Sequence, residues 1–299
     1  MSYNEQQYIS NLYKGILHNN QKFKSDDEKQ IKYDFLKNEF IALSDRFYLR
    51  TIAGQGTDLD KAHNLLVHFR KRINVSINGS SSETNAFEIL EKYYKNKKNE
   101  LSYIAFSKLM QEIFMSCGVP ARQVFMYPYS PYDVSSNVVV EIYNRSTAKW
   151  VLIDTFNSGY YVDGDGEKLS LLEARELFGR NVPVTFLAAN KKLKDIEKEI
   201  KKNININIDF MKNAFYFTVN SIQTFGEEGE RLYFIPKNFS VVMNQVANNE
   251  FRLGQISNKN QEYQEFQKER IDDAKSEYEP DGTSIQSLET CDETEYVNQ

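Results

Sequence analysis

The residue types that can support nucleophilic catalysis are few in this chain. It has two cysteines, Cys117 and Cys291, and three histidines, His18, His63 and His68. A thiol beside an imidazole could attack a carbonyl carbon, because the imidazole takes the proton from sulfur. His63 and His68 lie five positions apart on one predicted helix, about 140° apart around its axis, so they would not bind one metal ion together. We expect the histidines to pack at or near the surface, with a rebuilt active site as the alternative.

The two cysteines have different settings. Cys117 closes an apolar segment, where a cysteine usually behaves as a small buried hydrophobe. Cys291 lies in a polar tail. Two cysteines so placed cannot make a framework of disulfides, and we expect free thiols in a reducing compartment.

An acidic turn, Asp163-Gly164-Asp165-Gly166, is the one sequence that resembles a cation-binding loop. A calcium-binding helix-loop-helix needs Gly at the sixth position of its loop and Glu at the twelfth. Counted from Asp163, those positions hold Lys168 and Ala174. The sequence therefore predicts a tight turn between strands, and we expect no metal and no cofactor.

A buried helix followed by strands would have to position any site. Residues 101–117 are apolar at most positions, as in a helix buried on nearly all sides, and Gly118 ends it. Three segments rich in Val, Ile, Tyr and Trp follow and predict an antiparallel sheet: 121–127, 138–143 and 149–154. The predicted fold class is α+β, with the buried helix packed on the sheet.

The two ends of the chain differ from this middle part. Residues 1–50 carry apolar positions at helical spacing and predict a helical N-terminal extension. Residues 256–275 predict a polar helix. Residues 276–299 hold seven acids and neither Lys nor Arg, which predicts a disordered acidic tail.

Composition narrows the possible partners. The formal charge is −5, and the bases form no concentrated stripe, so we expect no nucleic-acid partner. No apolar run approaches the roughly 18 residues of a membrane helix, so we expect no membrane partner. The first twenty residues have no secretion pattern, which predicts a cytoplasmic location.

The segment after the apolar helix resembles a known family. Residues 118–124, Gly-Val-Pro-Ala-Arg-Gln-Val, resemble the Gly-Ile-Pro-Ala-Arg-x-Val signature of the transglutaminase-like superfamily. Residues 141–143 and 149–154 resemble its strand pair ending in Trp-x-x-x-Asp-Pro-Thr, and two later segments, 160–173 and 211–215, are similar to a bacterial branch of the family. The resemblance implies a papain-like fold and a transglutaminase-like domain over residues 51–255.

Members of this family carry a catalytic Cys at the start of the buried helix, a His on the next strand and an Asp on the strand after it. The helix dipole and the imidazole lower the thiol pKa, and the carboxylate fixes the imidazole tautomer. Carried over by spacing, these positions fall on Tyr103, Asn137 and Asp154, and Thr155 replaces the proline after the Asp. The resemblance therefore implies a degenerate triad.

No neighbouring residue restores this chemistry. A phenol with a pKa of roughly 10 is a poor nucleophile, and the Asn137 amide cannot activate Tyr103. Ser102 is expected to be the N-cap of the helix. Cys117 lies fourteen residues after Tyr103, roughly 21 Å along the helix. Asp154 is either a relic of the triad or a structural anchor.

We therefore expect a catalytically inactive protein, a pseudoenzyme, that binds a peptide, a protein or a small ligand in the former cleft. The cleft would be lined by Ser102, Tyr103, Asn137 and Asp154. Two alternatives remain open: an enzyme of altered acyl or amide chemistry that uses a rebuilt polar site, and a structural or assembly component.

Overall fold

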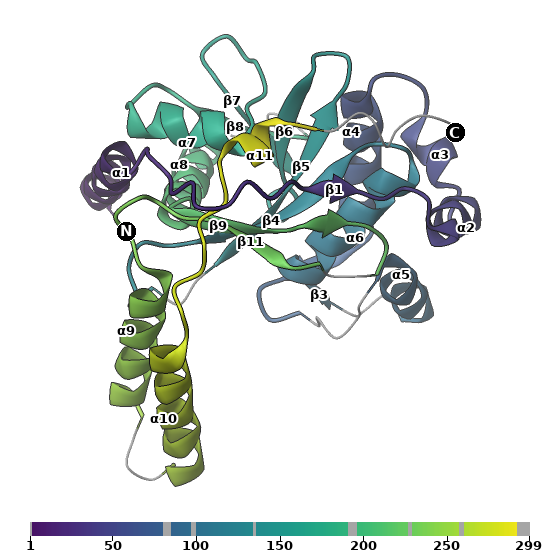
Figure 1. Cartoon of the computed structure of the whole chain (residues 1–299). Coiled ribbons are helices and arrows are strands. Elements are labelled where there is room, and N and C mark those ends of the chain that lie inside the picture. Colours follow the sequence, from purple (N-terminus) through teal and green to yellow (C-terminus); the bar gives the residue numbers. More distant parts are fainter. Residues whose placement is uncertain are drawn as a thin grey trace.

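A seven-stranded antiparallel sheet forms the centre of the molecule (Figure 1). The computed structural model describes residues 2–79, 85–96, 100–133, 136–190, 196–226, 229–256 and 260–291, with only the backbone of 196–201. In spatial order the strands are β11 (Arg231–Phe234), β9 (Tyr216–Asn220), β4 (Ala121–Tyr127), β5 (Asn137–Asn144), β6 (Lys149–Asp154), β7 (Gly159–Val162) and β8 (Thr185–Ala188). The chain is thus of mixed α+β class, as predicted.

The three predicted strands are confirmed. β4 and β6 have the predicted bounds, and β5 is one residue longer at each end. Every residue of β5 is buried, because helices cover both faces of the sheet. A strand covered on both faces reads as a nearly continuous apolar run instead of an alternating one.

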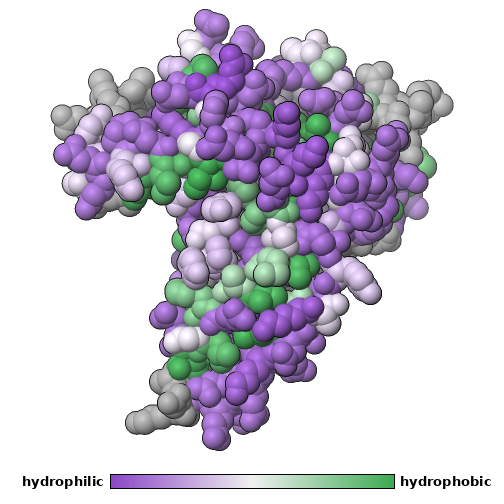
Figure 2. Space-filling view, turned by 60° about the vertical axis from the view of Figure 1, so that its left-hand side comes forward, coloured by the Kyte–Doolittle hydropathy of each residue, from purple (hydrophilic) through white to green (hydrophobic). Residues whose placement is uncertain are grey.

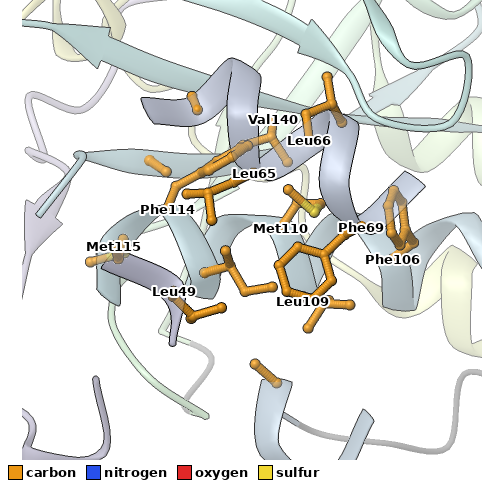
Figure 3. Packing of buried hydrophobic residues seen from close by; sticks show 14 of the residues in the cluster. Leu49, Leu65, Leu66, Phe69, Phe106, Leu109, Met110, Phe114, Met115 and Val140 are labelled. Atoms are coloured by element: carbon orange, nitrogen blue, oxygen red, sulfur yellow. The ribbon is translucent and has the colours of Figure 1, made fainter. Parts of the chain in front are cut away.

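Helix α6 (Tyr103–Ser116) is the buried helix predicted from the sequence, with eleven buried residues. It ends at Ser116, and Gly118, two residues later, has a φ of +73° that an L side chain rarely adopts. Four helices surround α6 on this face: α2 (Asn38–Arg46), α3 (Leu49–Ala53), α4 (Asp58–Arg70) and α5 (Ala86–Lys95). Figure 3 shows α4 residues Leu65 and Phe69 packed against Leu109 and Met110 of α6.

The other face of the sheet is covered by three helices, α1 (Tyr3–Asn19), α7 (Leu171–Gly179) and α8 (Ile196–Asn213). Between α1 and α2 the chain is extended, and its short strand β1 (Lys32–Tyr33) pairs with β10 (Ile222–Gln223). The predicted helical extension over 1–50 is therefore only partly helical. It is also no appendage, because Leu17 belongs to the core on this face and Leu43 to the core around α6.

Two small elements complete the body. Strands β2 (Asn74–Ser76) and β3 (Glu100–Ser102) form a parallel pair, and β3 leads directly into α6. The predicted acidic turn is a hydrogen-bonded turn after β7, in which the Asp163 carboxylate accepts from the backbone N–H groups of Asp165 and Glu167.

A helical hairpin projects from the body (Figure 1). It consists of α9 (Val241–Gly254), which the sequence did not predict, and α10 (Gln261–Ser276), the predicted polar helix. Figure 2 shows hydrophobic residues gathered on one side of this hairpin beside hydrophilic ones. Within the part of the chain that the structure describes, no helix is both long and apolar enough to cross a membrane.

The predicted disorder of residues 276–299 is wrong for the part up to residue 291. From Ser276 the chain runs back across the body and forms α11 (Gln286–Glu289) (Figure 1). Leu288 is buried, and Glu279 binds the N-terminus of α9. The acidic composition predicted disorder. Composition does not show that Leu288 has a buried site on the body, or that Glu279 can bind the N-terminus of α9. Residues 292–299 lie outside the described residues.

Candidate functional site

Ser102 and Tyr103 begin α6, as predicted. The Ser102 hydroxyl accepts a hydrogen bond from the backbone N–H of Ala105 at 3.0 Å, so Ser102 is the N-cap. The Tyr103 hydroxyl lies 3.3 Å from both the carbonyl oxygen and Oγ of Ser136. Its ring packs edge-on against Phe156, with ring centroids 6.1 Å apart. A side chain held this way occupies the start of the helix without presenting a reactive group.

Asn137 begins β5 and has two polar contacts. Its Oδ1 accepts from the backbone N–H of Val138 at 2.8 Å, and its Nδ2 lies 3.5 Å from Oδ2 of Asp209 in α8. Partial burial raises the pKa of Asp209, against the influence of nearby Lys212. Asn137 therefore faces α8 and a carboxylate, which an amide can bind but cannot use for proton transfer.

Asp154 ends β6 and is fully buried. Its two carboxylate oxygens accept from the backbone N–H and the Nδ2 of Asn157, both at 2.8 Å. Burial raises the pKa of Asp154, and the hydrogen bonds from Asn157 oppose that rise. The carboxylate thus closes the turn between β6 and β7, which favours the structural-anchor interpretation of this residue.

The three triad positions do not form a triad. Val140 of β5 pairs with Ile153 of β6, so these two side chains lie on the same face of the sheet. Side chains alternate between faces along a strand. Asn137 is three residues from Val140 and Asp154 is one residue from Ile153, so both lie on the opposite face. Val140 and Ile153 pack with α6, whereas Val139 and Leu152 pack with α8. Tyr103 at the start of α6 consequently meets Ser136 and not Asn137.

The cysteine and histidine side chains lie elsewhere. Burial raises the pKa of Cys117 to about 11, so its thiol stays protonated at neutral pH. His63 lies with Nδ1 3.2 Å from the Tyr160 hydroxyl, and His68 packs edge-on against Phe69. Among the described residues, no group of three His, Cys, Asp or Glu side chains is arranged to hold a metal ion.

Two residues of this region had no recognisable role in the sequence. Asp209 reaches Asn137 from a helix more than seventy residues later, and no local pattern indicates that contact. Asn157 follows Asp154 by three positions, and an Asp whose carboxylate binds a backbone N–H a few residues later is a common turn pattern. That pattern could have predicted the anchoring role of Asp154.

Next to these residues is a cavity of about 420 Å³. Ser136, the partner of Tyr103, is one of its lining residues, and the cavity, called the Ser136 cavity below, lies between the body and the α9–α10 hairpin. Ser102, Tyr103, Asn137 and Asp154 are not among its lining residues. Of the predicted cleft residues, Tyr103 contacts the lining residue Ser136 and Asn137 follows it in the chain, so the cavity is next to these two positions and is not the predicted cleft.

Comparison of the chain with known families, proteins and structures finds one distant structural likeness to report. No family model and no curated protein matches the chain. A solved structure described as that of a proposed cysteine protease from Cytophaga hutchinsonii is similar over 40% of each chain, with 16% identity and a TM-score of 0.31. The chain thus spans less than half of that protein, and a likeness at this TM-score carries no argument about this one.

Replacing Asp154 tests whether it is an anchor. Asp154→Ala should lower the free energy of unfolding by about 1–3 kcal/mol, because Asn157 loses the acceptor of its buried hydrogen bonds. Asp154→Asn keeps one acceptor and should cost less. Because the folded-state pKa of Asp154 is raised, ionisation costs stability, and the stability of Asp154→Asn relative to wild type should rise from about pH 4 upward.

Urea unfolding of the three proteins between pH 4 and 8 measures both effects. An Asp154→Ala protein as stable as wild type would contradict the anchoring role. A difference between Asp154→Asn and wild type that does not change with pH would contradict the raised pKa.

Proposed function

We propose that this chain is a non-catalytic protein with a papain-like, transglutaminase-like core that binds a peptide or another small ligand beside the former catalytic positions. The observation that carries the proposal is how the side chains at the three predicted triad positions are hydrogen-bonded. Each has its polar atoms bound to a different partner: Tyr103 to Ser136, Asn137 to Asp209 and Asp154 to Asn157.

The core assignment has two supports. The sequence signature at residues 118–124 resembles that of the transglutaminase-like superfamily. The order of elements is the one the resemblance implies, a buried helix followed by antiparallel strands β4, β5 and β6. Because the sheet positions that should carry the base and the carboxylate face away from α6, this core lacks the arrangement of a Cys-His-Asp hydrolase.

The ligand-binding part of the proposal has a separate support. The volume of the Ser136 cavity is within the usual range for a small-molecule or peptide site. It is lined by amide, guanidinium, carboxylate and tyrosine side chains, which can bind polar groups through hydrogen bonds. Nothing in that set is a nucleophile paired with a base, so binding without turnover is the function that it supports.

An activity screen tests this proposal. The purified chain, the Asp154→Ala variant and the Tyr103→Phe variant are incubated with ester, amide and glutaminyl-peptide substrates and with a thiol-directed alkylating probe. We expect no turnover above buffer in any of the three. Turnover by the wild type that Asp154→Ala abolishes would contradict the proposal, because it would assign Asp154 a catalytic role.

A further inference from the structure

The Ser136 cavity has three walls. Tyr127 and Tyr216 at the end of the sheet form one wall, with their rings stacked 4.8 Å apart. The loop between β4 and β5 forms the second, through Asp133 and Ser136. The hairpin forms the third, through the following α9 and α10 residues: Asn244, Gln245, Asn248, Asn249, Arg252, Arg270, Asp273, Ala274 and Glu277, the last directly after α10.

A row of hydrogen-bond donors runs along α9 at this cavity. Asn244, Asn248 and Arg252 are spaced four residues apart and so lie on one side of the helix. The Asn244 amide donates to the carbonyl oxygen of Tyr129 at 2.9 Å, and the Asn248 amide donates to that of Pro131. The first two members of the row thus already bind the main chain of the β4–β5 loop.

The spacing of this row matches an extended chain. Four residues advance about 6 Å along a helix, and two residues advance about 6.6 Å along an extended strand. Successive donors of the row can therefore bind alternate carbonyl groups of one extended segment, as they do at residues 129 and 131. The loop then turns, with the Asp133 N–H bonded to the Ser130 carbonyl oxygen.

After this turn, the described part of the loop, residues 128–133 and 136, supplies no carbonyl to the third donor. Arg252 Nε is buried and has no hydrogen-bond partner among the described residues. Among the described residues, no carboxylate forms an ion pair with Arg252 either. By contrast, the Asp133 carboxylate on the loop is 3.4 Å from Lys212 Nζ. A buried guanidinium donor without an acceptor costs free energy, which a bound acceptor would recover.

A carboxylate is the group that fits this place best. Guanidinium binds carboxylates through two parallel charge-assisted hydrogen bonds, which are stronger than bonds to neutral carbonyls. Arg270 lines the same cavity and adds a second positive charge, while Asp273 and Glu277 offer acceptors for the N–H groups of a main chain. We propose that the cavity binds the carboxyl-terminal end of an extended peptide, whose main chain lies along α9 beside the β4–β5 loop and whose carboxylate binds Arg252.

This inference rests on the proposed function, because a peptide held in this way is bound and not cut. The occupant is defined by its chemistry, an extended main chain with a free terminal carboxylate. Side-chain preference is left to the two tyrosines, whose rings can contact apolar groups next to the carboxylate.

Nuclear magnetic resonance tests the site on the full chain labelled with nitrogen-15. The probes are two pools of N-acetylated tetrapeptides with randomised side chains, one with free carboxyl termini and one with amidated termini. We expect the free-acid pool to shift the side-chain signals of Asn244, Asn248 and the Arg252 Nε–H, and to bind about tenfold or more tightly than the amidated pool. In Arg252→Gln this difference should disappear.

The matched control is Arg180→Gln on α7, whose side chain is exposed and pairs only with Glu176 among the contacts described. It should keep the full preference for the free-acid pool. Equal affinity for the two pools, a preference that survives in Arg252→Gln, or no shift at millimolar pool concentration would overturn the inference. Cleavage products appearing in the same spectra would instead contradict the proposed function while leaving carboxylate binding intact.

Discussion

Replacing Glu141 with alanine is expected to lower the free energy of unfolding by about 3–5 kcal/mol, because it leaves a buried arginine unpaired. Arg122 donates from Nε and Nη2 to one oxygen of Glu141, at 3.0 and 2.6 Å, and both side chains are only 2% exposed. The other Glu141 oxygen accepts from the backbone N–H of Leu171 at the start of α7. The guanidinium also lies 3.7 Å above the Trp150 ring. One carboxylate thus joins β4, β5 and α7.

The comparison that isolates this pair is a double variant. Arg122→Met with Glu141→Leu removes both charges together and should be less destabilising than Glu141→Ala alone. The exposed pair of Arg180 and Glu176 is the matched control, and Arg180→Ala should change stability by only about 0–0.5 kcal/mol. Urea unfolding at pH 7 measures all three variants. A Glu141→Ala protein within about 1 kcal/mol of wild type would contradict the argument.

Removing residues 277–299 is expected to lower the free energy of unfolding by about 4 kcal/mol or more. Three losses contribute. Glu279 no longer binds Ser240 and the free N–H groups at the start of α9, which costs about 1 kcal/mol. The burial of Leu288 is lost, at about 2 kcal/mol. Arg122 loses the Leu288 carbonyl as an acceptor at 2.7 Å, at about 1–3 kcal/mol.

Removing residues 292–299 alone is the control, because the contacts named for Glu279 and Leu288 remain. That protein should be more stable than the longer deletion variant by about 4 kcal/mol or more, the sum of the three losses above. The longer deletion should also make the α9–α10 hairpin more accessible to proteases, since Glu279 links the chain after α10 to the start of α9. Equal stability of the two deletion variants would show that residues 277–291 contribute nothing to the folded state.

The elements that the sequence predicted well are those whose pattern is local. Residues 101–117 are apolar at most positions, and Tyr103–Ser116 within them form the buried helix α6. Residues 121–127 and 149–154 are rich in β-branched and aromatic residues, and they form β4 and β6 with the predicted bounds. Ser102 before an apolar run predicted a helix cap, and its hydroxyl makes that hydrogen bond.

The elements that the sequence predicted poorly depend on distant partners. Leu17 and Leu43 were assigned to one extension, yet they pack on opposite faces of the sheet. The acidic tail was predicted to be disordered, because its composition shows charge but not the site that Leu288 fills. Helix α9 was missed, since its polar residues include Asn244 and Asn248, whose amides are used to bind a loop more than a hundred residues earlier.

The sequence by itself determined the α+β class and the residue types at the three positions predicted to correspond to a triad, because strand and helix periodicity and residue type are local properties. Only the tertiary structure decided which way those residues face. Strand register places Asn137 and Asp154 on the side of α8, where Asp209 and Asn157 bind them, and leaves Tyr103 with Ser136. The same packing leaves Arg252 Nε without an acceptor among the described residues, while the main chain of the β4–β5 loop binds Asn244 and Asn248.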